Sequence, residues 1–99
     1  MSVDYFLGLS YNIASYALLT HILAKLTGLE VGELIFDGGD IHLYENAVPQ
    51  CMEMVSRQPK EERVKLIMPN DVSLTGMSVN DFKFENYNPH PKLTAKMAI

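Results

Sequence analysis

The feature that most constrains this chain is residues 12–26, whose pattern predicts a helix that is apolar on most of its circumference. Four polar residues interrupt the apolar run from Ile13 to Leu26: Ser15, Thr20, His21 and Lys25. A helix that is apolar all round is normally buried on several sides, so it needs covering surfaces in more than one direction. Ser10 or Asn12 is expected to cap its start, and Gly28 to end it in a left-handed conformation.

The rest of the chain predicts short strands and a second helix. Residues 33–44 favour a strand interrupted by Gly38 and Gly39, where a bulge or a close approach to the backbone is expected. A helix is expected from Asn46 to about Arg57, strands at 64–68 and 82–84, a polar loop at 70–76, and one helical turn starting at Ser78. This order predicts an α/β or α+β fold, and 99 residues fit one small domain.

Composition excludes several classes of function. The net charge is −4, and two arginines and six scattered lysines form no basic stripe, so we expect no nucleic-acid partner. No apolar run is long enough for a membrane span, and no signal segment is visible. One cysteine, Cys51, cannot form an internal disulfide, which favours a cytoplasmic location. No grouping of His, Cys and carboxylates has zinc-site spacing, so no metal is expected.

His42 and Tyr44 are the most informative polar pair. They are two residues apart on a predicted strand, just after the double glycine, so both side chains project from the same face. Imidazole and phenol can each donate and accept a hydrogen bond, and together they could hold a ligand hydroxyl. From spacing alone, an ordinary half-exposed strand face is the more frequent explanation of such a pair.

Asn12 and Cys51 are weaker candidates. The carboxamide of Asn12 offers a donor beside an acceptor, which matches the N3–H and O4 of a uracil ring, but from the sequence pattern alone a plain helix cap is the favoured explanation. Cys51 lies on the apolar face of the second helix with Val48 and Val55. A buried thiol without a basic partner stays protonated, so Cys51 is interpreted as structural.

Several long motifs resemble the thymidylate synthase family. Residues 2–16 read SVDYFLGLSYNIASY, where the family pattern is Arg-Ser-x-Asp-x-Phe-Leu-Gly-Leu-Pro-Phe-Asn-Ile-Ala-Ser-Tyr. Residues 38–44, GGDIHLY, followed by Asn46, are similar to a second family motif. Residues 87–91 and 96–99, YNPHP and KMAI, match the family's C-terminus. The resemblance implies that residues 1–99 are a single partial domain. It would be the C-terminal part of the thymidylate synthase fold, with a mixed sheet packed against a long buried helix.

The resemblance also implies a reaction. Thymidylate synthases methylate dUMP reductively to dTMP, and 5,10-methylenetetrahydrofolate is the co-substrate that donates the carbon and the hydride. A thiolate adds to C6 of the uracil ring and makes C5 nucleophilic toward the folate methylene. dUMP and folate are therefore the implied ligands. A homodimer, or association with the missing N-terminal part of the family's chain, is the implied assembly.

Matched positions carry the family's site roles by resemblance. Asn12 would bond the uracil edge, and His42 and Tyr44 would bond the deoxyribose 3′-hydroxyl. Ser2 would contact the phosphate, Asp4 would help to bind both pterin and pyrimidine, and Gly8 would let the backbone approach the ligands. Ala98 and the carboxylate of Ile99 would belong to a tail that closes over bound folate and excludes water.

The sequence departs from the family pattern in ways that bear on activity. The Pro-Cys-His segment that holds the nucleophile is absent, and Met1 stands where an arginine should precede Ser2. The other phosphate arginines are missing too, Ser10 and Tyr11 replace Pro-Phe, and the loop from Pro69 to Gly76 matches poorly. We therefore expect no catalytic residue in this chain and no turnover by the chain alone.

Two other functions stay open on the sequence alone. One is a non-catalytic nucleotide-binding or interaction module derived from the family. The other is a related pyrimidine hydroxymethylase, for which the carboxamide of Asn12 is unfavourable, because such enzymes carry Asp there to match cytosine.

Overall fold

The computed structural model describes residues 2–97. The helices are α1 (Leu9–Thr27) and α2 (Val48–Ser56). The strands are β1 (Val3–Asp4), β2 (Ile41–His42), β3 (Lys65–Ile67) and β4 (Lys83–Glu85). Two short 3₁₀ turns cover Glu45–Ala47 and Val79–Asp81.

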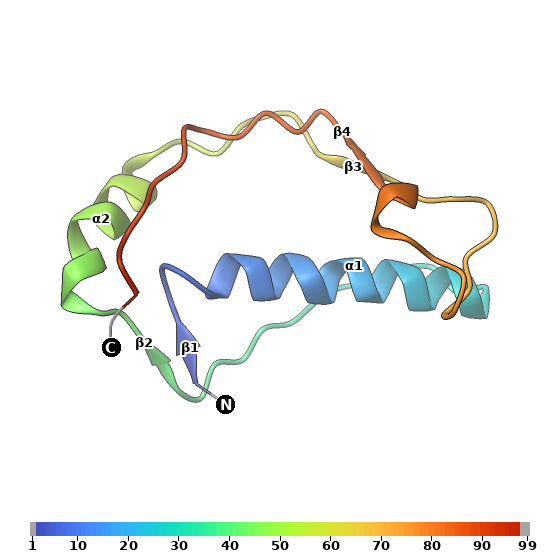
Figure 1. The fold of residues 1–99 in the computed structure, drawn as a ribbon, viewed down its shortest axis with the longest axis horizontal. Helices are drawn as coiled ribbons and strands as arrows, with labels where there is room; N and C mark the ends of the chain where they lie inside the picture. Colours follow the sequence, from blue (N-terminus) through green and yellow to red (C-terminus); the bar gives the residue numbers. More distant parts are fainter. Residues whose placement is uncertain (1, 98–99) are drawn as a thin grey trace.

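The elements form an open arrangement around α1, which lies along the long axis of the molecule (Figure 1). β1 and β2 pair in parallel near the start of α1, with Asp4 opposite His42. β3 and β4 pair antiparallel, with Leu66 opposite Phe84, in an arch of chain that runs from the α2 end to the far end of α1 (Figure 1). The mixed α/β class is confirmed, with its parallel and antiparallel pairs in two separate small sheets.

α1 starts earlier than the sequence predicts. Its N-cap is Gly8, so the prediction that Ser10 or Asn12 caps the helix is wrong, and both residues lie inside it. The reason is the turn that precedes the helix: Asp4 Oδ1 accepts hydrogen bonds from the amides of Phe6 and Leu7, at 3.0 and 3.1 Å. Gly8 N–H donates to the Asp4 carbonyl at 2.9 Å, and this turn continues directly into the helix.

The other end of α1 is as predicted. Gly28 is left-handed, with φ 72°, and its N–H reaches the carbonyls of Ala24 and Lys25. The turn at Ser78 is also confirmed: its hydroxyl accepts from Asn80 N–H, and Asp81 Oδ2 accepts from Ser78 N–H at 2.8 Å. The second helix is confirmed in position, but Asn46 lies in the 3₁₀ turn before it and the N-cap is Ala47.

The predicted strand at 33–44 is largely wrong. Only Ile41–His42 forms a strand, and residues 29–38 run without regular structure beside α1. Extended backbone becomes a strand only where a neighbouring strand satisfies its hydrogen bonds, and no strand of the described residues pairs with 33–38.

Few side chains of the described residues are buried. Val3, Ala47 and Cys51 are the buried apolar residues, and no residue of α1 is buried. The accessible surface is 8338 Å², whereas a compact chain of 11.1 kDa exposes about 5,700 Å². The radius of gyration is 16.1 Å, against about 12.6 Å for a compact domain of this length. Burial of α1 on several sides is therefore not reached by residues 2–97 and stays a prediction. In that part of the chain no helix is long and apolar enough to cross a membrane.

Candidate functional site

His42 and Tyr44 lie together, as the strand spacing predicts. Their rings pack edge to face, with centroids 4.8 Å apart and planes at 74°. His42 is the last residue of β2, and Tyr44 lies just beyond it in extended conformation, with φ −71° and ψ 144°. Because side chains alternate along extended backbone, residues two apart share a face, and the short strand is enough to place both rings on one wall.

The pairing of β1 with β2 brings this wall against the start of the chain. The Asp4–His42 register places the β1 residues and the following turn beside the two rings. A shallow cavity of about 400 Å³ results. Its lining is Ser2, Asp4, Leu7, Gly8, His42, Tyr44 and Met97. Five of the six residues that the resemblance assigns to dUMP therefore lie around one cavity, although they come from both ends of the stretch 2–44.

Asp4 and Gly8 stabilise the turn that borders this cavity. The Asp4 carboxylate holds the turn before α1 through its Oδ1. A Cβ added at Gly8 would lie 3.3 Å from the Asp4 carbonyl oxygen, tighter than ordinary van der Waals contact. The absence of a side chain at Gly8 therefore serves the close approach of the turn to itself, whether or not a ligand is bound.

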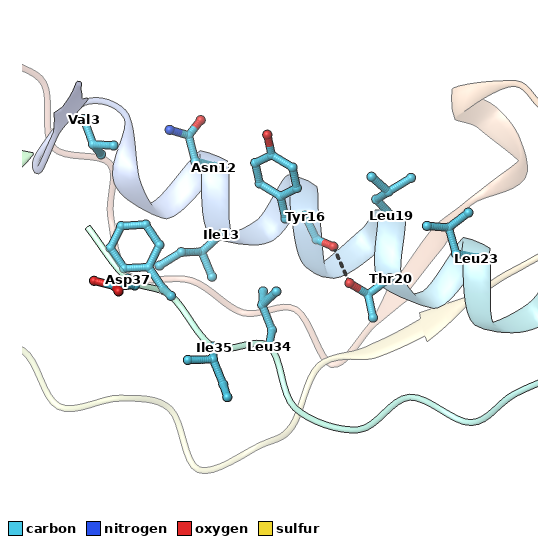
Figure 2. A pocket seen from close by; sticks show the side chains of 11 residues that line it. Val3, Asn12, Ile13, Tyr16, Leu19, Thr20, Leu23, Leu34, Ile35 and Asp37 are labelled. Atoms are coloured by element: carbon cyan, nitrogen blue, oxygen red, sulfur yellow. Dashed lines mark hydrogen bonds between the residues drawn. The ribbon is translucent and has the colours of Figure 1, made fainter. Parts of the chain in front are cut away.

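Asn12 is the residue that the structure does not bring into this cavity. It lies one helical turn further along α1, and its amide N–H donates to the Gly8 carbonyl at 3.0 Å. Its side chain lines a second cavity of about 360 Å³ between α1 and residues 34–37 (Figure 2). In Figure 2 Asn12 and Tyr16 project from the same side of the helix. The carboxamide caps no helix end, so the simple explanation of Asn12 as an N-cap is wrong.

The other candidate residues that the sequence singles out lie outside the two cavities or outside the described residues. Cys51 is 7% exposed and is one of the few buried residues, in agreement with a structural role. Ala98 and Ile99 lie outside the described residues. Within residues 2–97 no three His, Cys, Asp or Glu side chains gather as a metal site would require. Leu7 and Met97 were missed at the cavity, because apolar side chains carry no chemical signal that marks a binding site in sequence.

The fold and the cavity define a class: a mixed α/β chain that presents a polar wall suited to a small molecule. The family model for thymidylate synthase matches residues 1–99. The chain therefore belongs to the thymidylate synthase family, and its mixed α/β structure is consistent with part of that fold.

Curated relatives support the same family. The chain is 53% identical over 102 residues to a protein named "Probable thymidylate synthase" from Escherichia phage T5, covering 98% of this chain and 36% of that protein. It is 46% identical over 98 residues to the thymidylate synthase of Francisella tularensis subsp. holarctica, and 43% identical to that of Francisella philomiragia, in each case covering 99% of this chain and 36% of the relative. The chain thus spans about a third of the length of the curated relatives it matches.

Proposed function

We propose that this chain supplies the nucleotide-binding wall of a thymidylate synthase, which methylates dUMP reductively to dTMP with 5,10-methylenetetrahydrofolate. The observation that carries the proposal is the edge-to-face pair of His42 and Tyr44, 4.8 Å apart, in a cavity shared with Ser2 and Asp4. Two neighbouring rings that each carry donor and acceptor atoms can bind one hydroxyl from both sides. In dUMP that group is the deoxyribose 3′-hydroxyl.

The rest of the nucleotide extends from this point in the proposal. Ser2, at the edge of the cavity, contacts the phosphate. The pyrimidine passes Gly8 and reaches the carboxamide of Asn12, one helical turn away, which reads the N3–H and O4 of uracil. Asp4 Oδ1 accepts from two amides, so in the proposal Oδ2 is the oxygen that bonds pyrimidine and folate. Ala98 and Ile99 complete the folate side.

Binding and catalysis are divided between segments in this proposal. The nucleophile that attacks C6 of uracil must be an accessible thiolate, and Cys51, the one cysteine, is buried at 7% exposure in α2. No lysine or arginine of the described residues lines the His42–Tyr44 cavity, so a phosphate dianion there finds no cationic partner. The nucleophile and the phosphate cations therefore come from another segment, and the chain by itself does not turn over dUMP.

The apolar surface that α1 and residues 34–36 expose supports a state of the protein in which another protein surface covers it. α1 carries half-exposed Tyr16, Leu19 and Leu23 along one cavity, and residues 34–36 add Leu34, Ile35 and Phe36. In the proposal this surface is covered either by a second copy of the chain or by the remaining part of the synthase. The site would then operate in the cytoplasm as part of that assembly.

Calorimetric titration with dUMP tests the proposed binding site. The unmodified chain is expected to bind dUMP weakly, since the phosphate lacks cations. Tyr44→Phe removes one hydroxyl and is expected to weaken binding about fivefold to tenfold, the effect of one hydrogen bond. Tyr87→Phe is the matched control, because Tyr87 packs against Phe84 and does not line the cavity. Equal dUMP affinity in Tyr44→Phe and the unmodified chain would contradict the assignment.

A turnover assay tests the division of roles. The pure chain with dUMP and methylenetetrahydrofolate is expected to yield no dTMP, because its one thiol is buried and cannot add to C6. Measurable dTMP formation would overturn this part of the proposal.

A further inference from the structure

The last segment of the described chain is held to α2 by side chains. Residues 86–97 have no helix or strand; the chain after β4 first follows the arch and then runs beside α2 (Figure 1). Asn46 Nδ2 donates to the Lys96 carbonyl at 2.7 Å, and Gln50 Nε2 donates to the Thr94 carbonyl at 3.1 Å. Arg57 Nη1 donates to the Pro91 carbonyl at 2.7 Å. These three bonds, here called the α2 ladder, join residues 34 to 50 positions apart in sequence.

The spacing of the α2 ladder explains why it can form. The donors follow one another in the order Asn46, Gln50 and Arg57, whereas their acceptors come in the reverse order of sequence. The tail therefore runs antiparallel to the segment that contains α2. Asn46 lies in the 3₁₀ turn before α2, and from there to Gln50 the chain rises about 7 Å, whereas two residues of extended chain, from Thr94 to Lys96, span about 6.6 Å. From Gln50 to Arg57, the residue that follows α2, the rise is about 10.5 Å, and three extended residues back to Pro91 cover about 10 Å.

This match fixes the register of the tail. The bonded carbonyls of Thr94 and Lys96 are two residues apart, the spacing at which extended backbone presents carbonyls on one side, so a slip by one residue would break both bonds. The Pro91 carbonyl, three residues before Thr94, lies outside this alternation and is bonded separately by Arg57. Gln50 Oε1 is buried and meets no donor among the described residues, so within them the bond to Thr94 is the one side-chain hydrogen bond that orients this carboxamide. At the far end, His90 Nε2 lies 2.7 Å from the Gln58 carbonyl and ties down the other side of Pro91.

The register of the tail determines where Met97 lies. Met97 comes directly after Lys96, and it lines the cavity of His42 and Tyr44. We propose that Asn46, Gln50 and Arg57 are positioning residues: they set the register of residues 91–97 and thereby place Met97 at the edge of the binding cavity. The identity of the ligand in that cavity rests on the proposed function, whereas the α2 ladder does not.

Limited trypsin digestion of the full chain tests the ladder without a ligand. Asn46→Asp and Gln50→Glu keep the shape of each side chain but replace the donor by a carboxylate oxygen facing a carbonyl. Each is expected to raise the rate of cleavage after Lys92 and Lys96 about twofold to tenfold, the range for loss of one hydrogen bond when opening is faster than cleavage. Glu45→Gln, an exposed change in the same turn, is the control and should leave both rates unchanged.

Cleavage after Arg63, in the loop beyond α2, serves as an internal reference in every digest. Unchanged rates after Lys92 and Lys96 in both variants would overturn the proposal. An equal rise after Arg63 would overturn it too, because it would show a general loss of stability instead of a released tail.

Titration with dUMP then connects the ladder to the site. Asn46→Asp is expected to weaken dUMP binding about twofold to tenfold with His42 and Tyr44 intact. Faster tail cleavage together with unchanged dUMP affinity would show that the ladder does not serve the cavity, which contradicts the placement of Met97. Faster tail cleavage with no dUMP binding by any variant would refute the proposed ligand and leave the ladder standing.

Discussion

Replacing Leu23 of α1 by aspartate tests whether the exposed apolar surface is an interface. Leu23 is 45% exposed and lines the cavity between α1 and residues 34–37 (Figure 2). The perturbation leaves the few buried side chains, Val3, Ala47 and Cys51, untouched. It should therefore act on association and leave the local structure of the chain in place.

The magnitude can be worked from the surface area. The chain exposes 8338 Å², about 2,600 Å² more than a compact chain of its mass. If a partner buried an equal area, the total would be about 5,200 Å², and permanent complexes bury about 2,000–5,000 Å² or more over both partners, so the excess is large enough for an obligate interface. Covering the exposed half of Leu23 contributes about 1 kcal/mol, and an unpaired carboxylate in its place adds a desolvation cost of several kcal/mol. Leu23→Asp should therefore weaken association at least about a hundredfold.

Light scattering after size exclusion measures this directly, with small-angle X-ray scattering on the same fractions. The unmodified chain is expected to show a mass above 11.1 kDa, and Leu23→Asp is expected to shift toward that value. Ser10→Asp adds the same charge in the first turn of α1, where the helix dipole favours it, and should behave as the unmodified chain. A monomeric unmodified chain with a radius of gyration near 12.6 Å, the value of a compact domain of about this length, would show that the apolar surface of α1 is not an interface.

Two further predictions concern local structure. Gly28→Ala should lower the free energy of unfolding by about 1 kcal/mol in a circular-dichroism melt, because φ is 72° there, whereas Gly32→Ala, with open space around its Cβ and no left-handed φ, should be neutral. Cys51 should react with a thiol reagent slowly in the native chain and rapidly in denaturant, because its side chain is buried, and equally fast reaction in both would contradict its structural role.

Local chemistry accounts for the features that the sequence predicts well. Gly28 ends α1 because only a residue without Cβ takes a left-handed φ cheaply, and Ser78 with Asp81 satisfies the free amides of one turn. His42 and Tyr44 share a face because alternation along extended backbone is a property of any strand. Each of these depends on residues within a few positions of one another.

The failures depend on residues that are distant or lie outside the segment concerned. The strand expected at 33–38 needs a neighbouring strand, and the described residues offer none. The start of α1 is moved to Gly8 by the side chain of Asp4, a turn that the apolar pattern of the helix does not register. Ser2 and Asp4 lie beside His42 because β1 pairs with β2, and composition and spacing do not predict this pairing. The resemblance to thymidylate synthases is what assigned these three residues to one ligand.

The most direct test of the central claim is a magnetic-resonance titration that follows the ring protons of His42 and Tyr44. The claim is that these two rings bind a deoxyribose 3′-hydroxyl. dUMP is expected to shift both rings, and the same nucleotide without its 3′-hydroxyl is expected to leave them nearly unchanged, with Tyr87 as the unaffected reference in both titrations. Equal shifts of His42 and Tyr44 with the two nucleotides, or none with dUMP, would show that the two rings do not bind the 3′-hydroxyl.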